Sequence, residues 1–502
     1  MGIIARQSIK ASIVGLVGVA IGAFTRLFLY TKFLTVSEIG ILETVVKLGI
    51  LMTPFFVVGA PQVILRFFNR FKEKQLNNRL IFTYAVLIFL IVTPIASLIY
   101  LLGKDLIFSL YTEAPELANY FLLPLLVAIT YGGFSFLRSI AVVHLRITIP
   151  TFLSGVLDRL MIMVLLIAYG VYGLVTIDQF IYLNIIVFFG FPMLFMLIYL
   201  ALVIKPEVVK PKFDEAWNII KESSAYNTYL IFGTLTGVVI SAIDVNMISG
   251  KLGTSLAGVY TIAFFMGTVI EIPQRSLTKI IYPILNKAML NNDVVEVKKL
   301  YQKSSVNQFL VGAFMFLVVW VNIDSIFAII PNGDSFLAGK LVVLYIGLGK
   351  LFDMTLGVNR QIIELSKYYK FNLLISIILS ILVIILNLIF IPLNSELFGG
   401  INGVAFASLL AVAVTNILSL AVVWLKEGFL PFSSQMILVL IPIFMFYGLS
   451  AFISISNPLL SIAVKGVIAV LVFVGASYYF RISEDFMLIL QLVVKRFKAL
   501  LS

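Results

Sequence analysis

The 502-residue sequence has no cysteine and only one histidine, His144. Disulfides and thiolate metal sites are therefore excluded, and a single histidine cannot form a metal site by itself. Charged residues are also scarce, at 12% against 61% hydrophobic residues, and the mean hydropathy is +1.11. This leaves too little polar surface to cover a water-soluble globule of this length, so the composition predicts a protein embedded in a bilayer.

The sequence also lacks any soluble-looking block, and it lacks the alternating apolar and polar residues of an outer-membrane barrel. Apolar stretches of about 20 residues, the length a helix needs to cross ~30 Å of hydrocarbon, recur from end to end instead. Because only helices and closed barrels satisfy the backbone in lipid, we expect an all-α polytopic membrane protein. The first stretch continues to about Leu34 without a small-residue cleavage site, so we expect it to remain as the first helix.

Fourteen helices are predicted, separated by clusters of Gly, Pro and Asn that are typical of turns. IPNGDS at 330–335 and PLNSELFGG at 392–400 are two such turns. The predicted helices cover residues 9–34, 38–64, 80–102, 117–143, 150–174, 178–204, 226–249, 256–283, 305–330, 337–361, 371–393, 400–424, 434–454 and 458–480.

Lysine and arginine are distributed unequally between the loops on the two sides of these helices. The side that holds both termini has twenty-four of the thirty-six, the other side has only Lys32, Lys104, Lys251 and Lys340, and eight fall within spans. Because cytoplasmic loops retain cations during insertion, both termini are predicted to be cytoplasmic. The net charge of +12 then reflects this bias and contact with anionic membrane lipids, not a nucleic-acid surface.

A polar connection with two prolines, within KPEVVKPKFDEAWNIIKESSAYN at 205–227, is predicted to separate two halves. An ungapped internal repeat supports duplication: FLTVSEIGIL at 33–42 matches KLGTSLAGVY at 251–260 at a leucine, a serine and a glycine. Transporters commonly contain duplicated helix bundles. We therefore expect two pseudo-symmetric six-helix bundles, plus a C-terminal helix pair. The predicted domains are bundles at 1–204 and 226–425, a linker at 205–225, the helix pair at 434–480 and a basic cytoplasmic tail at 481–502.

Eight cations fall within predicted spans, where a central charge costs at least ~2.5–3.5 kcal/mol and usually faces a cavity or a partner. Four lie about nine or more residues from a span end, beyond easy snorkelling, one is intermediate, and three are near enough to an end to reach lipid headgroups. In that order they are Arg26, Lys47, Arg159 and Lys350; Arg275; and Arg138, Lys279 and Lys465.

Five acids share the spans: Glu43, Asp158, Asp244, Glu271 and Asp353. Three lie three or four residues from a cation, which places each pair on one helix face. These pairs are Glu43 with Lys47, Glu271 with Arg275, and Lys350 with Asp353. One interpretation is that the pairs hold helices together. The other is substrate binding, because eight cations against five acids leave a positive surplus, and guanidinium groups bind phosphate bidentately at any cellular pH.

Prolines and glycines within spans are predicted to break or loosen helices, which is tolerated where the freed backbone lines a cavity or meets a neighbouring helix. The positions are Pro54 and Pro61 in the second helix, Pro273 in the eighth, and Gly347, Gly349 and Gly357 in the tenth.

Enzymatic motifs are not found. GLGKLFD at 347–353 lacks the spacing of a phosphate-binding G-x-x-x-x-G-K-[ST] loop, and no sizeable loop offers a place for glycosyl transfer. His144 follows the fourth predicted helix and is interpreted as an interfacial residue. We expect no enzymatic activity, no cofactor and no metal.

Several segments together resemble the polysaccharide-transporter branch of the superfamily that also holds the multidrug and toxin extruders, namely the Wzx-type flippases of lipid-linked oligosaccharides. The likeness spans nearly the whole chain and includes the half-to-half connection. Its specific segments are the long first helix with its basic start, FLTVSEIGIL, GAPQVILRFF at 59–68, and IPLNSELFGGINGVAFASLLAVAVTNIL at 391–418.

The resemblance implies a flippase that moves an undecaprenyl-pyrophosphate-linked oligosaccharide, such as an O-antigen repeat unit, across the bacterial inner membrane by alternating access. It implies two helical bundles around a central lumen with a cationic interior. Arg26, Lys47 and Arg275 lie in the first, second and eighth helices, where related flippases place essential cations. Arg159, Lys350, Arg138 and Lys279 are the further substrate-binding candidates. The resemblance also implies contact with polysaccharide polymerase machinery.

Two other functions fit the same sequence. Ion-coupled multidrug or metabolite exporters of the superfamily use carboxylates in the lumen, and Asp244, Glu271, Asp353 or Glu43 are the candidates for such a role. A scaffold for polysaccharide synthases that transports nothing is the third possibility.

Overall fold

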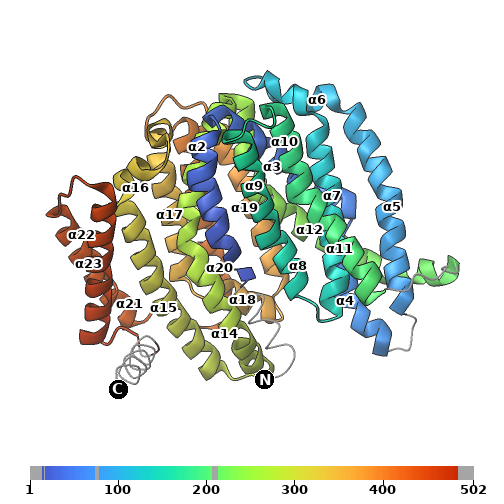
Figure 1. Ribbon diagram of the computed structural model, residues 1–502. Helices are drawn as coiled ribbons and strands as arrows, with labels where there is room; N and C mark the ends of the chain where they lie inside the picture. The colour runs from blue at the N-terminus through green and yellow to red at the C-terminus, as the bar shows by residue number, and fades with distance from the viewer. Residues whose placement is uncertain (1–13, 16, 74–77, 206–212, 484, 486–502) are drawn as a thin grey trace, which may run out of the picture. The chain divides into compact units, whose positions relative to one another are not determined.

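The computed structural model describes residues 14, 15, 17–73, 78–205, 213–483 and 485, and within them all regular structure is helical (Figure 1). Twelve helices in this part are long and apolar enough to cross a membrane, and Val86–Leu102 is a shorter apolar helix. The first predicted helix is described from residue 14, without residue 16. The predicted all-α polytopic architecture with about fourteen helices is confirmed.

Backbone contacts divide the chain into two compact units, Met1–Gly258 and Val259–Ser502. The division therefore falls within α13 (Thr254–Thr268), and not in the connection at 205–225. Helix α12 (Phe213–Leu252) is continuous and begins earlier than the predicted 226, because the amphipathic stretch before the span is its first part. Residues 206–212 and most of the predicted tail lie outside the described residues, so the domain boundaries stay a prediction.

In the first unit α3 is central, because it packs against α5, α7 and α12, while α4 packs against α5 and α7. Its helices are η1 (Thr25–Tyr30), α2 (Thr31–Phe33), α3 (Val36–Val57), α4 (Ala60–Glu73), α5 (Asn78–Leu102), α6 (Lys104–Phe108), η2 (Pro115–Tyr120), α7 (Leu122–Val143), α8 (Thr148–Phe152), η3 (Leu153–Leu157), α9 (Asp158–Gly170), α10 (Ile177–Ile185), η4 (Ile186–Gly190), α11 (Phe191–Tyr199), η5 (Leu200–Ile204) and α12.

Local sequence sets both ends of α3. Thr35 and Glu38 form a capping box, in which the Glu38 backbone N–H donates to the Thr35 hydroxyl and the Thr35 N–H donates to the Glu38 carboxylate. Contrary to the prediction, the helix does not break at Pro54, because this proline lies inside α3. The chain turns instead at Val58 and Gly59, which adopt φ values of 41° and 72°, and Pro61 then lies in the first turn of α4, where its missing N–H costs little.

In the second unit α15 packs against α14, α17, α22 and α23, and α20 packs against α17 and α19 (Figure 1). Its helices are the remainder of α13, η6 (Val269–Glu271), α14 (Ile272–Leu290), α15 (Val294–Val321), α16 (Ile323–Ile329), η7 (Gly333–Gly339), α17 (Lys340–Thr355), α18 (Asn359–Leu365), α19 (Lys370–Phe390), α20 (Gly400–Glu427), α21 (Ser434–Leu438), α22 (Leu440–Ala451) and α23 (Pro458–Tyr479).

The predicted interruptions in this unit are partly correct. A 3-10 turn, η6, separates α13 from α14, and Pro273 lies in the first turn of α14. The predicted loosening at Gly347 and Gly349 is wrong, because both lie inside the continuous helix α17. Gly357 does end the regular run, at φ 58°, in the turn before α18.

The two segments of the internal repeat pack against each other. A Cβ added to Gly40 would lie 1.8 Å from the backbone oxygen of Thr254, and one added to Gly258 would lie 2.0 Å from the backbone oxygen of Val36. The Ser37 and Thr254 hydroxyls are hydrogen-bonded at 2.8 Å. Position 36 corresponds to 254 and position 40 to 258 in the repeat, so the contact is reciprocal and pseudo-symmetric.

We predict that Gly40→Ala lowers the stability of the folded protein by about 1–3 kcal/mol, because the new methyl group must displace a backbone carbonyl. The measurement is the thermal unfolding midpoint of the purified protein in detergent. Gly237→Ala in α12 is the matched control, since a Cβ there meets no atom within 4 Å. Equal midpoints for the two variants would contradict the close contact.

Candidate functional site

Arg26 lies in the π-helical turn η1, and its Nη2 is 2.8 Å from Oε1 of Glu43 on α3. Such turns are rare and frequently occur at functional sites. Glu43 is only 4% exposed, and its other oxygen, Oε2, is buried without a hydrogen-bond partner among the described residues. The Arg26 side chain is 36% exposed. The pair therefore has one inaccessible acid and one cation that small molecules can still reach.

Lys47 lies one turn after Glu43 on α3, and its Nζ donates a hydrogen bond of 2.9 Å to the backbone carbonyl of Ser241 on α12. The predicted Glu43–Lys47 ion pair is therefore replaced by the Arg26–Glu43 pair and a backbone contact. Electrostatic interactions still couple Lys47 to Glu43, Arg26 and the buried Asp244. The structure thus brings Arg26, Lys47 and two of the predicted acids together.

Arg159 reaches this group from α9, where it rests on glycines of the first helix. A Cβ added to Gly22 would lie 3.0–3.1 Å from the Nε, Cδ and Cζ atoms of Arg159, and one added to Gly18 would lie 3.2 Å from its Nη1. A Cβ added to Gly18 would also lie 2.0 Å from the backbone oxygen of Gly155, so the first helix packs closely against η3. The glycine spacing of four places both on one helix face, and the bare backbone there leaves room for the guanidinium.

Asp158, the third acid predicted within the spans of the first unit, is 1% exposed and accepts a hydrogen bond of 2.8 Å from the Arg159 backbone N–H. Electrostatic interactions also couple Arg159 to Asp158 and Arg26. We call the six residues of this group the first charge cluster. It contains three cations and three acids, so its formal charge is balanced: Arg26, Lys47 and Arg159 with Glu43, Asp158 and Asp244.

The second unit holds a smaller group around Glu271, which ends η6. Its Oε1 forms an ion pair with Nη2 of Arg275, as the spacing predicts, and its Oε2 forms an ion pair with Nζ of Lys350 on α17. The predicted Lys350–Asp353 pair is wrong, because Asp353 accepts a hydrogen bond of 3.1 Å from the Gln274 amide instead. Two cations therefore share one carboxylate, and we call Glu271, Arg275 and Lys350 the second charge cluster.

The second charge cluster carries a formal charge of +1 and remains accessible. The Arg275 side chain is 69% exposed and that of Lys350 is 31% exposed, whereas Glu271 is 13% exposed. Lys279, one turn after Arg275 on α14, is exposed as well. An anion approaching these cations meets two to three positive groups and one acid whose oxygens are already engaged.

The other predicted positions lie apart from these groups in the contacts the structure gives. Arg138 is exposed on α7, and Lys465 is half-buried on α23. His144 caps the end of α7, where its Nδ1 is 2.8 Å from the Ile140 carbonyl and its ring lies against Phe68. Among the described residues, no group of three His, Cys, Asp or Glu side chains could hold a metal ion.

Sequence reasoning missed several neutral residues of the clusters. Asn184 donates from Nδ2 to the hydroxyl of Tyr30 at 3.3 Å in the buried wall beside Arg26, and Gln274 holds Asp353. Neutral amides within apolar spans are costly to bury unless they are hydrogen-bonded, which is the signal that would have identified both. The Gly18 and Gly22 pair was visible as a small-residue spacing on the first helix.

No family model and no curated protein matches the sequence. The fold is nevertheless similar to solved transporter structures. One is described as the lipid II flippase MurJ in an inward closed conformation, at 16% identity and a TM-score of 0.70, with 94% of this chain and 99% of that chain covered. Another is an inward-facing multidrug resistance MATE family transporter of the MOP superfamily, at 14% identity and a TM-score of 0.60, with 85% and 98% covered. The chain therefore has the fold of MurJ and MATE transporters.

We predict that Gly22→Ala moves the Arg159 guanidinium, because the new methyl group takes the space against which its stem packs. The measurement is the rate at which phenylglyoxal modifies Arg159 in the purified protein, followed by peptide mass spectrometry. The rate should change severalfold. Gly15→Ala, where a Cβ meets nothing within 4 Å, should leave it unchanged, and identical behaviour of the two variants would refute the contact.

We predict that Glu271→Gln destabilises the protein by about 1–2 kcal/mol, since Arg275 and Lys350 lose their shared carboxylate; the partial exposure of both cations limits the loss. Adding Lys350→Met should recover part of the stability, because it removes one of the two unmatched charges. The thermal unfolding midpoints of the single variants and the double variant test this coupling. Purely additive effects would mean that the pair does not interact.

Proposed function

We propose that the chain is a flippase of the Wzx type, which moves a polyprenyl-diphosphate-linked oligosaccharide from one leaflet of the bacterial cytoplasmic membrane to the other. The observation that carries this proposal is the second charge cluster, in which Arg275 and Lys350 share Glu271 and leave a positive charge within the apolar helices. Fixed cations at such a position suit a diphosphate. The shared fold with a lipid II flippase supports a lipid-linked substrate.

Arg26 and Arg159 are proposed to bind phosphate oxygens of the substrate through their guanidinium groups. A guanidinium presents a planar fork of donors that matches two phosphate oxygens and stays charged at any cellular pH. Arg26 directs its guanidinium to Glu43, which orients it, and its side chain is 36% exposed. Arg159 is similarly oriented by packing on Gly18 and Gly22. Orientation by neighbours reduces the entropy lost when the diphosphate binds.

The proposed cycle exposes the bound diphosphate first to the cytoplasmic side and then to the outer side, while the polyprenyl chain stays in hydrocarbon. An interior-negative potential favours outward passage by ~2.3 kcal/mol per uncompensated charge per 100 mV, so no ATP site is required. The loop charge bias, with both termini on the cation-rich side, supports this orientation. Contact with polysaccharide polymerase machinery belongs to the same proposal.

We predict that Arg26→Ala and Arg159→Ala each slow flipping at least tenfold, because each removes a charge-assisted phosphate contact worth about 1.5–3 kcal/mol. The assay uses proteoliposomes, in which outward movement of a fluorescent polyprenyl-diphosphate oligosaccharide is followed by quencher access. Arginine-to-lysine variants should retain part of the rate. Lys104→Ala, an exposed cation at the start of α6, is the control, and all variants should reach the membrane in equal amounts.

If the arginine variants lose membrane abundance to the same extent as flipping rate, the interpretation that the ion pairs only hold helices together is favoured. The buried carboxylates Glu43 and Asp244, on a fold shared with a MATE transporter, favour ion-coupled drug export as the second candidate. Overexpression should then raise resistance to cationic dyes, while the proteoliposomes show no lipid flipping. If the substitutions change neither activity, the scaffold interpretation is the one that survives.

A further inference from the structure

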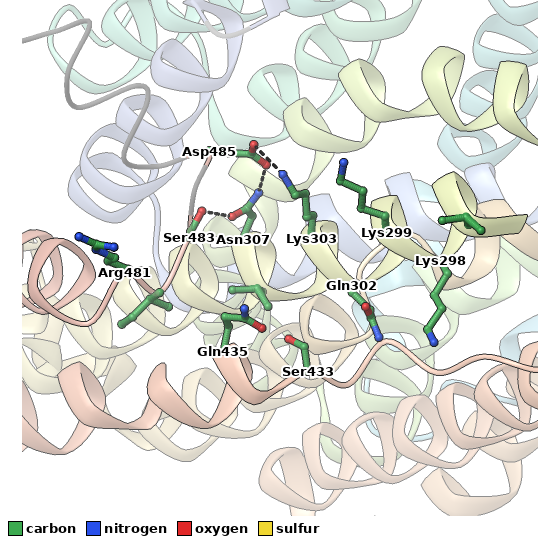
Figure 2. Close-up of a pocket in the computed structure, with 13 residues that line it drawn as sticks. Lys298, Lys299, Gln302, Lys303, Asn307, Ser433, Gln435, Arg481, Ser483 and Asp485 are labelled. Atoms are coloured by element: carbon green, nitrogen blue, oxygen red, sulfur yellow. Dashed lines mark hydrogen bonds and ion pairs between the residues drawn. The ribbon is translucent and has the colours of Figure 1, made fainter. Parts of the chain in front are cut away.

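A pocket of about 460 Å³ lies in the second unit where three helix ends meet (Figure 2). Its walls are the first turns of α15, the chain at the start of α21, and the chain that follows α23. Each of these helices belongs to a candidate membrane span that begins or ends at this point: Val294–Val321, Ser434–Ala451 and Pro458–Tyr479. The pocket therefore lies at one edge of the membrane-spanning region, where lipid headgroups are found.

The lining of this pocket is strongly basic. Lys298, Lys299, Lys303 and Arg481 contribute four cations, and Asp485 contributes the one acid among the lining residues. Lys299 and Lys303 are four residues apart on α15, an arrangement in which like charges repel each other. Lys298 and Lys299 form no ion pair within the described part of the chain. This excess of positive charge favours an anionic ligand.

The acid is engaged in holding the pocket together. Asn307 donates from Nδ2 to Asp485 at 3.0 Å and accepts from the Ser483 hydroxyl at 2.5 Å, and Lys303 lies 3.7 Å from the same carboxylate (Figure 2). Arg481 adopts φ 50° directly after α23. Beyond this left-handed residue, Ile482, Ser483 and Asp485 line the pocket beside α15. Hydrogen bonds and an ion pair therefore join two walls of the pocket, α15 and the chain that follows α23.

A second, apolar cavity lies further along α15 and α23. Val306 and Asn307 line the pocket, and one turn further along α15 Leu310 and Val311 line a second cavity of about 140 Å³. On α23 the second cavity reaches Ser477, four residues before Arg481. A basic compartment at the membrane edge followed by an apolar one along the span matches a molecule with an anionic head and a hydrocarbon chain.

We propose that this pocket binds the headgroup of an anionic glycerophospholipid, with part of one acyl chain between α15 and α23. Three of its four cations are lysines, whose ammonium groups act as point charges on flexible stems and do not form the planar fork of a bidentate clamp. In Figure 2 the side chains of Lys298 and Lys299 point in different directions, and both line the pocket, so their charges are spread along its wall and do not converge on one phosphate. This site is separate from the charge clusters and does not depend on the transported substrate.

Native mass spectrometry of the full-length protein in mixed phosphatidylglycerol and phosphatidylcholine tests the proposal. The wild type should retain phosphatidylglycerol in preference to phosphatidylcholine. Each lysine near an anionic headgroup contributes about fivefold in affinity, so Lys298→Gln with Lys299→Gln should weaken retention about 25-fold. The double arginine variant, Lys298→Arg with Lys299→Arg, should retain the lipid.

Lys287→Gln with Lys426→Gln removes two cations from the ends of other helices, α14 and α20, and is the matched control for net charge. Its retention should equal that of the wild type. Equal loss in both glutamine variants, or equal retention of the two lipids, would overturn the proposal. Displacement by millimolar inorganic phosphate would identify a site for free anions, and preference for a polyprenyl phosphate would identify a substrate site; either result overturns it as well.

Discussion

Charge in an apolar interior persists only where another group compensates for its lost hydration, and the arrangement of both units follows from this constraint. In the first unit each of three cations interacts with at least one of three acids, and a backbone carbonyl and a backbone N–H supply further hydrogen bonds. In the second unit the compensation is incomplete, because one carboxylate serves two cations. The two clusters therefore differ in formal charge: the first charge cluster is balanced, and the second carries +1.

The apolar runs were sufficient to predict the helices, because the hydrocarbon thickness dictates their length. The depth of Arg26, Arg159 and Lys350 in those runs was likewise sufficient to identify them as residues of interest. Spacing along the helix predicted the Glu271–Arg275 pair, but partners on other helices were not predictable, because spacing finds only neighbours on the same helix. Lys350 contacts Glu271 from another helix, and the Gln274–Asp353 contact that replaces the expected pair also joins two helices. Such pairings depend on packing, which one sequence does not contain.

Helix boundaries followed the same logic. Capping residues such as Thr35 and Glu38 are local, and the start of α3 lies within two residues of its predicted position. The sequence predicts a break of this helix at Pro54, but the backbone turns at Val58 and Gly59. Proline inside a span costs little when neighbouring helices satisfy the freed backbone groups. The start of α12 was predicted too late, since hydropathy marks where a helix enters lipid and not where it begins.

The reciprocal contact of Gly40 and Gly258 has a consequence for how this protein can change over evolutionary time. Each glycine faces a main-chain oxygen belonging to the opposite copy of the repeat. A smaller side chain at a neighbouring position cannot make room for a larger residue here, because the obstructing atom is a main-chain oxygen. Any larger residue at either position therefore requires the main chain of the other segment to move, so these two positions constrain each other.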